Sequence, residues 1–136
     1  MLERALRLGR PGSYLIQAAI AALHAQAPSF AETDWPQIAG LYAELARHDP
    51  SPVVAVNRAV AVGFADGPRA GLEVLHGVAG DTRLARYQPL YAARAELLSR
   101  AGDAPGADAA YAEAIALTAN EAERAALERR RAKMSR

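Results

Sequence analysis

The chain has 136 residues, of which 51% are apolar and 23% charged, so it is long enough for one domain with its own core and is not a disordered chain. A balance of 16 basic and 15 acidic side chains leaves a net charge of +1, which excludes a global field that attracts DNA or an anionic membrane. Because cysteine, a signal peptide and apolar runs of membrane-spanning length are absent from the sequence, we expect a cytoplasmic protein without disulfides.

Residues 1–8 resemble the last turns of a helix rather than the start of a domain, because no N-cap residue precedes them. We therefore expect the chain to be cut from a longer parent, or to descend from one. The next helix is predicted over 13–26, where apolar residues recur at helical spacing. These apolar residues are Ile16, Ile20 and Leu23.

Asp34 predicts the start of the following helix, because its carboxylate can accept a hydrogen bond from a free backbone N–H group of the first turn. Pro36 suits that first turn, and Pro50 ends the helix. The two helices are predicted to form a first hairpin over 12–48. The apolar stripe of its second helix contains Trp35, Ile38, Tyr42 and Leu45.

A second hairpin is predicted over 52–79. Ser51 and Pro52 supply the cap and the first residue of its first helix, and residues 66–68 supply the turn. Its residues recur 36 positions later, since Asn57-Arg58-Ala59 corresponds to Ala93-Arg94-Ala95, and Gly71 to Ala107. The chain therefore contains an internal helical repeat.

The third hairpin, over 87–118, shows the repeat most clearly. Gly102 and Asp103 form its turn, and one face of its second helix carries a small, a large and a small residue at i, i+4 and i+7. These three residues are Ala107, Tyr111 and Ala114. The pattern resembles a tetratricopeptide repeat (TPR), whose two short helices bury too little apolar surface alone and therefore stack on neighbours.

Asn120 is expected to cap a last helix over 120–134, which carries Leu127 and Met134 on a thin apolar stripe and is otherwise charged. A polar outer face is typical of a helix that closes a stack of repeats. The sequence thus predicts one all-α domain over 1–136, a TPR-like α-solenoid of about three antiparallel helical hairpins plus a C-terminal capping helix.

Patterns of catalytic or metal-binding chemistry are absent from the sequence. Its three histidines are not at ligand spacing, and it has no HExxH, Walker, GxGxxG or GxSxG motif. We expect no catalytic residue, cofactor or metal, and hence no enzyme. The basic C-terminal tail is interpreted as a solvated helix end and not as a DNA-binding patch. It comprises Arg129, Arg130, Arg131, Lys133 and Arg136.

Arg58 and Arg94 occupy equivalent repeat positions at which ordinary TPRs prefer leucine. A structural interpretation, in which each pairs with a carboxylate such as Glu44 or Glu73 or with a helix C-terminal carbonyl, is favoured over contact with a partner.

The first helices of stacked hairpins line a concave face that can hold a peptide or a helix. The same face could instead pack against a missing neighbour or take up the chain's own C-terminal helix, and these alternatives stay open. The candidate partner-binding residues are Gln17, His24, Asn57, Arg58, Phe64, Glu96 and Arg100.

Three strings, YLIQAAIAALHAQAP, DWPQIAGLYAELARHDPSPVVAVNRAVAV and YAARAELLSRAGDAPGADAAYAEAIALTANEAERAALERR, closely resemble the C-terminal TPR-like domain of bacterial extracytoplasmic-function (ECF) RNA polymerase sigma factors. The resemblance runs from about Leu2 to Arg130. It implies a regulatory extension that follows two sigma domains, is needed for sigma activity and stands in for a separate anti-sigma factor. Both sigma domains are absent from the sequence, so promoter recognition is carried over to no residue.

Two hypotheses of function follow. In the first, the chain is a non-catalytic regulatory domain that contacts sigma domains, core RNA polymerase or a signalling partner. In the second, it is a free-standing TPR adaptor that binds a peptide or self-assembles as a homo-oligomer through its truncated N-terminal end. An enzyme or small-molecule sensor would require a closed pocket with convergent polar groups.

Overall fold

The computed structural model describes residues 11–26 and 32–134, and over these residues the chain forms seven α-helices, one short 3-10 helix and no strand. The prediction of an all-α chain is confirmed for this part. The expected helix end at residues 1–8 lies outside the described residues. The elements are α2 (Pro11–Gln26), α3 (Trp35–His48), α4 (Pro52–Asp66), α5 (Pro68–His76), η2 (Thr82–Leu84), α6 (Gln88–Arg100), α7 (Ala104–Leu117) and α8 (Glu121–Met134).

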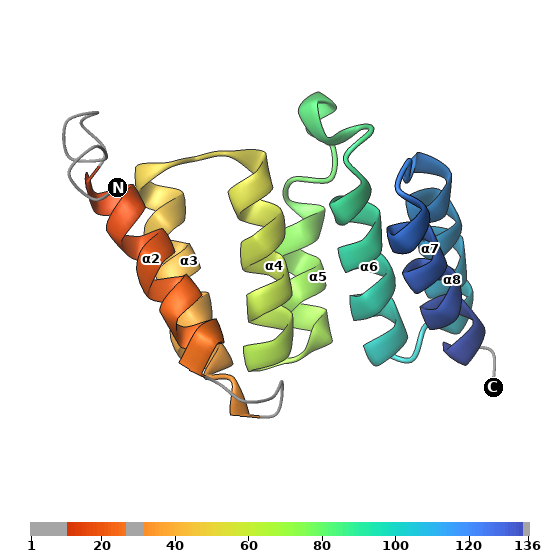
Figure 1. Cartoon of the computed structure of the whole chain (residues 1–136), viewed down its shortest axis with the longest axis horizontal. Helices are drawn as coiled ribbons and strands as arrows, with labels where there is room; N and C mark the ends of the chain where they lie inside the picture. Colours follow the sequence, from red (N-terminus) through yellow and green to blue (C-terminus); the bar gives the residue numbers. More distant parts are fainter. Residues whose placement is uncertain (1–10, 27–31, 135–136) are drawn as a thin grey trace.

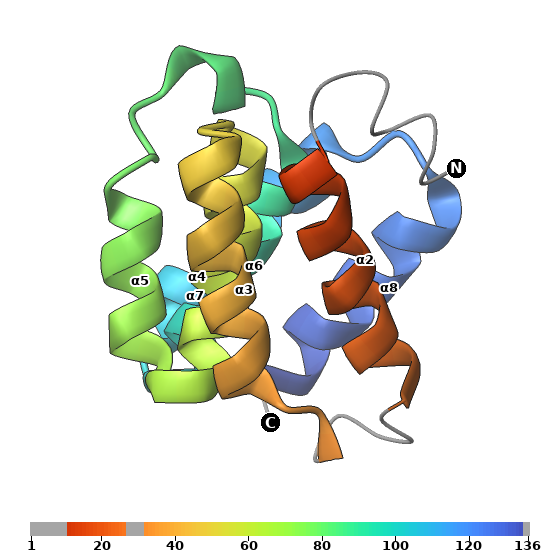
Figure 2. The ribbon, with the colours of Figure 1, turned by 90° about the vertical axis from the view of Figure 1, so that its left-hand side faces the viewer.

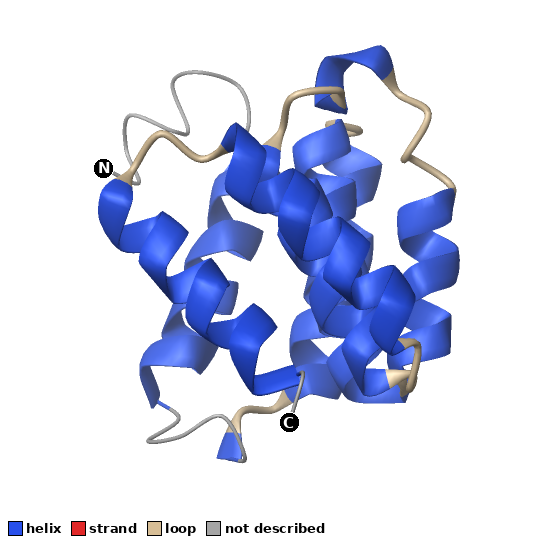
Figure 3. Cartoon of the chain, turned by 90° about the vertical axis from the view of Figure 1, so that its right-hand side faces the viewer, coloured by secondary structure: helices blue, strands red, loops and turns tan. Residues whose placement is uncertain are grey.

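Consecutive helices pack in pairs, α2 with α3, α4 with α5 and α6 with α7, and the pairs follow one another along the long axis of the molecule (Figure 1). The last helix, α8, packs against α7. Figure 2 shows α2 and α8 on one side of this row and α5 on the other. Figure 3, from the opposite end, shows helices joined by loops throughout the described part. Along the row, α4 and α6 lie between α2 and α8 (Figure 1).

Side-chain caps fix the starts of four helices. In each case an oxygen of the residue before the helix accepts a hydrogen bond from a backbone N–H group of the first turn, which has no partner within the helix. The predicted caps at Asp34, Ser51 and Asn120 are confirmed. The bonds run from Gln37 N to Asp34 Oδ1 (3.1 Å), Val53 N to Ser51 Oγ (3.2 Å), Gly106 N to Asp103 Oδ1 (3.0 Å) and Glu123 N to Asn120 Oδ1 (3.0 Å).

The turn between α6 and α7 is built on Gly102, as the sequence predicts. Gly102 has a φ of +89°, a left-handed conformation that a side chain would strain. Its N–H group bonds to the carbonyl of Ser99 (3.1 Å), and the N–H group of Asp103 bonds to the carbonyl of Leu98 (2.9 Å). This pair of bonds satisfies two carbonyls at the end of α6 and turns the chain directly into α7.

Small residues bring α4 and α5 close together. A Cβ atom added to Gly71 would lie 2.6 Å from the carbonyl oxygen of Ala59 and 2.7 Å from the Cα atom of Gly63. Both neighbours are backbone atoms, so the two helices touch main chain to main chain. The equivalent position in the next pair, Ala107, is also a small residue and is fully buried.

The core divides into three clusters along the row. The first two clusters each join helices of neighbouring pairs, and the third joins α6 and α7 of one pair with α8, so each hairpin covers its apolar face with the element that follows it. The predicted burial of Tyr111 and Ala114 on α7 is confirmed. The clusters centre on Ile20, Ile38, Leu45, Val54 and Ala61, then on Val56, Leu75, Leu84, Leu90 and Leu97, and then on Ala95, Ala110, Tyr111, Ala114 and Leu127.

The connection from α5 to α6 is more ordered than a surface loop. It contains η2, and Leu84 in this short helix is only 1% exposed because it enters the middle cluster. The hydroxyl of Tyr91 donates a hydrogen bond to the carbonyl of Ala85 at 2.9 Å, which ties the connection to α6. This packing was not predicted from the sequence.

Candidate functional site

A hollow of about 500 Å³ is lined by residues of α3, α4, α6 and α8. We call it the central hollow. Its floor comes from α4 and α6, and single residues from α3 and α8 complete its wall. Its lining residues are Trp35, Val56, Asn57, Val60, Phe64, Gln88, Pro89, Ala92, Ala93, Glu96, Arg100 and Arg130.

One end of the central hollow is aromatic. The rings of Trp35 and Phe64 lie with their centroids 4.7 Å apart at an interplanar angle of 52°. The guanidinium carbon of Arg100 lies 4.6 Å from the centroid of the Phe64 ring, so its positive charge faces the electron-rich ring. The three side chains come from three helices and pack against one another, so this end of the hollow is an aromatic wall with a cation at its edge.

Glu96 holds the polar groups of this wall in place. Its carboxylate accepts a hydrogen bond from Arg100 Nε at 3.2 Å and a longer one from the Tyr111 hydroxyl at 3.4 Å. Burial raises the pKa of Tyr111, and the negative charge of Glu96 raises this pKa further. The hydroxyl therefore stays protonated at neutral pH and acts as a donor to the carboxylate.

Arg130 enters the central hollow from α8. It is exposed, and among the described residues no carboxylate lies within ion-pair distance of it. Its neighbour Arg131 instead binds Asp108 of α7 through two nitrogens, at 2.7 and 3.1 Å. This two-pronged ion pair fixes α8 against α7 and leaves the charge of Arg130 available at the edge of the hollow.

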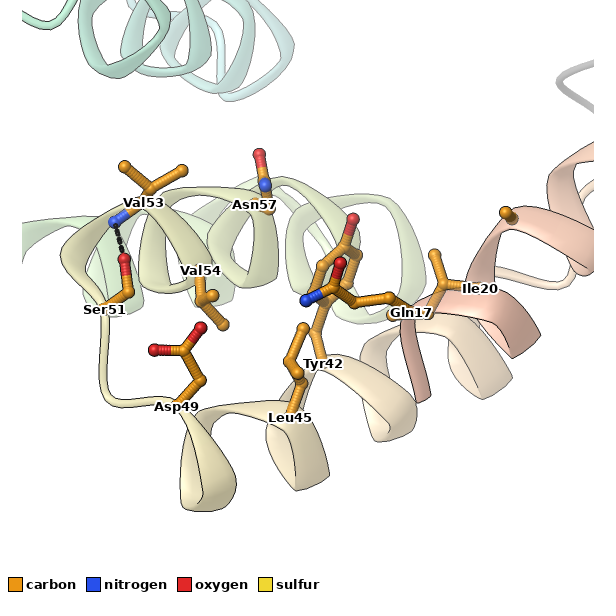
Figure 4. Close-up of a pocket in the computed structure, with 10 residues that line it drawn as sticks. Gln17, Ile20, Tyr42, Leu45, Asp49, Ser51, Val53, Val54 and Asn57 are labelled. Atoms are coloured by element: carbon orange, nitrogen blue, oxygen red, sulfur yellow. Dashed lines mark hydrogen bonds between the residues drawn. The ribbon is translucent and has the colours of Figure 1, made fainter. Parts of the chain in front are cut away.

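A second hollow of about 490 Å³ lies between α2, α3 and α4. We call it the α2–α4 groove. In Figure 4 the side chains of Tyr42 and Leu45 from α3 lie between those of α2 and those of α4. Burial raises the pKa of Tyr42, so its hydroxyl is neutral at pH 7. The lining residues are Gln17, Ile20, Ala21, Tyr42, Leu45, Asp49, Ser51, Val53, Val54 and Asn57.

The structure brings together five of the seven residues that the sequence indicated as candidates for partner binding. Asn57, Phe64, Glu96 and Arg100 line the central hollow, and Gln17 lines the α2–α4 groove, which Asn57 also borders. Arg58 lies in α4 but lines neither hollow. His24 lies in α2, but its side chain is outside what the structure describes.

The predicted pairing of Arg58 and Arg94 with carboxylates or helix-end carbonyls is wrong. The carboxylate of Glu44 binds Arg47 (3.2 Å) and His48 (3.4 Å) within its own helix. Within the described part of the chain Arg58 has no ion pair, and its Nε atom is buried without a hydrogen-bond partner. Arg94 instead lies over the ring of Tyr91, with its guanidinium carbon 5.5 Å from the ring centroid.

Arg94 also lines a third hollow, of about 570 Å³, between α5 and α6. Leu72 and His76 of α5 face it there. This hollow lies between the second helix of one pair and the first helix of the next, away from the residues of the central hollow. It unites none of the predicted candidate residues.

Trp35, Asp49 and Arg130 are among the lining residues of the two hollows that were not predicted as site residues. Trp35 was assigned to the apolar stripe of its helix, and Arg130 to a solvated helix end. For Arg130 a signal existed, because it follows buried Leu127 by three positions and so lies on a neighbouring side of the same helix.

Comparison with known proteins gives one relative of the chain. No family model matches the sequence, and no solved structure matches it. An uncharacterized protein of Rhizobium meliloti (strain 1021) is 46% identical over 125 residues. The match covers 92% of this chain but 29% of the relative, so the chain spans less than a third of the length of that protein. In the described ranges, no helix combines the length and the apolar character needed to cross a bilayer.

Proposed function

We propose that this chain is a non-catalytic protein-interaction domain with a TPR-like solenoid fold, acting as the C-terminal regulatory domain of an ECF-type sigma factor. The paired helices in a row support the solenoid, as does the 36-residue repeat that places Ala59 and Ala95 at equivalent buried positions. The three sequence strings that resemble the sigma-factor domain support the assignment to that family.

The observation that carries the interaction function is the central hollow. It is open, much of its floor is apolar, and the carboxylate of Glu96 accepts hydrogen bonds from Arg100 and from buried Tyr111, which orients the polar groups of its wall. Aromatic and arginine side chains in such a setting are the residues that contribute most to protein interfaces. A prearranged wall of this kind loses little conformational freedom when a partner binds.

The relative from Rhizobium meliloti supports a role within a longer protein. The segment of that protein that matches this chain is 29% of its length, so the matched unit has other protein attached to it. In a sigma factor the attached part would contain the two sigma domains. The interaction face of this chain would then contact those domains, core polymerase or a signalling partner, and so adjust transcription initiation.

The experiment is a pull-down with the purified chain as bait. Its prey are core RNA polymerase and the separately purified sigma domains of an ECF-type sigma factor that has such a C-terminal domain. We expect at least one prey to bind the wild-type chain and Arg100→Ala to lose most of this binding. The matched control is Arg69→Ala, which removes an equally long cation that is exposed on α5 and lines neither the central hollow nor the α2–α4 groove.

Circular dichroism establishes that both variants are folded. Equal losses in Arg100→Ala and Arg69→Ala would argue against the central hollow as the binding site. Failure of the wild-type chain to bind either prey would reject the sigma-factor role, and a free-standing TPR adaptor would become the better account.

A further inference from the structure

We propose that the central hollow and the α2–α4 groove hold one continuous protein segment, with an acidic side chain at its Arg130 end and a basic side chain at its Asp49 end. This inference rests on the proposed interaction function and adds the chemistry and the direction of the bound segment. Continuity, charge and apolar surface along the two hollows each support it.

The two hollows adjoin each other on α4. Asn57 lines both of them, and their volumes are similar, about 490 and 500 Å³. A compact small molecule would fill one hollow and leave the other open. An extended polypeptide crosses both, and the Asn57 amide between them can donate and accept hydrogen bonds with its backbone.

The Arg130 end of this path is positive. Of the described residues that line the central hollow, Arg100 and Arg130 are cations and Glu96 is an anion, whose charge already faces Arg100. The guanidinium group of Arg130 has no ion-pair partner among the described side chains. A carboxylate of the bound segment would supply one, in the two-pronged geometry that guanidinium groups favour.

The Asp49 end is negative. Among the described residues that line the α2–α4 groove, Asp49 is the one that is charged, and no described cation lies within ion-pair distance of its side chain. A lysine or arginine of the bound segment would balance it. The opposite charges at the two ends fix the direction in which a segment with one acidic and one basic end lies.

The surface between the two ends is apolar. Val53 is 38% exposed, which is high for a valine, and it borders the α2–α4 groove. Half-buried Val60, one of the residues that line the central hollow, continues this surface along α4. The bound segment is therefore expected to carry apolar side chains between its charged ends, because these side chains would remove Val53 and Val60 from water.

A random 12-residue peptide library displayed on phage tests the inference without knowledge of the natural partner. The library is selected against the intact wild-type chain and against two charge-reversal variants, Arg130→Glu and Asp49→Lys. Two matched controls carry the same charge changes at exposed positions outside both hollows, Arg129→Glu and Asp66→Lys. The strongest peptide from the wild-type selection is then titrated into each protein and followed by fluorescence anisotropy.

We expect the wild-type chain to select peptides with an acidic and a basic end around an apolar middle. Each reversal variant should weaken the selected peptide about tenfold, the effect of exchanging an attractive contact for a repulsive one, while each control stays within about twofold of wild type. Arg130→Glu should select peptides in which a basic residue replaces the acidic one.

The inference is overturned if no peptide is enriched, if the enriched peptides lack this charge pattern, or if the controls weaken binding as much as the reversals do. The result of the peptide experiment can be distinguished from the result of the pull-down that tests the proposed function. Charge-dependent peptide binding together with a failed sigma-domain pull-down would reject the sigma-factor role alone. A successful pull-down with charge-independent peptides would reject the segment chemistry alone.

Discussion

At the scale of single residues, Gly71 and Gly40 show how position decides the role of a glycine. Both lie inside helices, yet a Cβ atom at Gly71 would meet backbone atoms of Ala59 and Gly63 at 2.6 and 2.7 Å, whereas one at Gly40 would have no neighbour within 4 Å. Gly71 thus permits the contact between α4 and α5.

We predict that Gly71→Ala lowers the free energy of unfolding by about 1–3 kcal/mol, because the backbone of α4 has to move away. Gly40→Ala should raise it by about 0.5–1 kcal/mol, because alanine favours the helix. Urea denaturation of the two variants measures both changes. A neutral Gly71→Ala would mean that the backbones of α4 and α5 are not in contact at this position.

Tyr111 combines a packing role with a polar one. Its ring is 2% exposed, and its hydroxyl donates to Glu96 across 3.4 Å. Tyr111→Ala should lower the free energy of unfolding by about 3–5 kcal/mol, as truncations of buried aromatic side chains do. Because the hydrogen bond is long, Tyr111→Phe should cost no more than about 1 kcal/mol. A cost below about 1 kcal/mol for Tyr111→Ala would contradict its burial between α6 and α7.

The raised pKa of Tyr111 gives a dependence of stability on pH. The folded state holds the phenol proton more tightly than the unfolded state, whose pKa is near 10.0. The associated stability is present below pH 10 and is lost as the pH rises through the folded pKa. Above pH 10 the wild-type chain should therefore lose stability faster than Tyr111→Phe in denaturation experiments. Parallel losses would show that this tyrosine has an ordinary pKa.

The sequence predicted the burial of Tyr111 because periodic spacing indicates which face of a helix is apolar. It did not predict the surroundings of Arg58. Spacing cannot show that Glu44 is already bound by Arg47 and His48 of its own helix, three and four positions away. Local pairs on a helix compete with pairs between helices, and the competition depends on distances that a sequence does not contain.

At the scale of secondary-structure elements, helix starts were predictable because caps depend on local side-chain chemistry. Asp34, Ser51 and Asn120 each accept the expected backbone hydrogen bond. The packing of η2 was not predictable, because a single leucine in a connection has no periodicity. Only the folded chain brings Leu84 against the middle cluster.

Leu84→Ala should cost about 2–5 kcal/mol, a loss typical of a core leucine and unusual for a residue between helices. Arg86→Ala, an exposed change in the same connection, should stay within about 0.5 kcal/mol of wild type. Thermal and urea denaturation of both variants provide the comparison. Similar small effects at the two positions would show that the connection is a surface loop.

The ion pair between Arg131 and Asp108 should hold α8 on α7 in a pH-dependent way. The hydrogen bonds from Arg131 lower the pKa of Asp108 below its usual 3.8. The contribution to stability is thus present above pH 3.8 and is lost as the pH falls through the lower folded pKa.

We therefore predict that Asp108→Asn is less stable than wild type at pH 7, and that the difference shrinks as the pH falls through the lowered pKa of Asp108 and the wild-type carboxylate takes up a proton. Hydrogen exchange at pH 7 should be faster in α8 of the variant than in α8 of the wild type, whereas exchange in α4 should be the same in the two proteins. A stability difference between the two proteins that is the same at pH 7 and at acidic pH would exclude the ion pair as its cause.

At the scale of the whole molecule, the order of helices and the all-α class were predictable, because both follow from local periodicity and turn residues. The full composition of the site was not. Trp35 and Arg130 are separated by most of the chain and line the same hollow because α3, α4, α6 and α8 all contribute residues to it. The candidates on α4 and α6 were predictable because these are the first helices of their hairpins, which were expected to line one face.

Hydrogen–deuterium exchange of the chain, alone and bound to sigma domains or core polymerase, tests the central claim most directly. We predict slower exchange on binding in α4 and α6, which form the floor of the central hollow, and unchanged exchange in α5 on the other side of the row. Protection confined to α5, or a stable complex in which neither α4 nor α6 is protected, would contradict the assignment of the interaction surface.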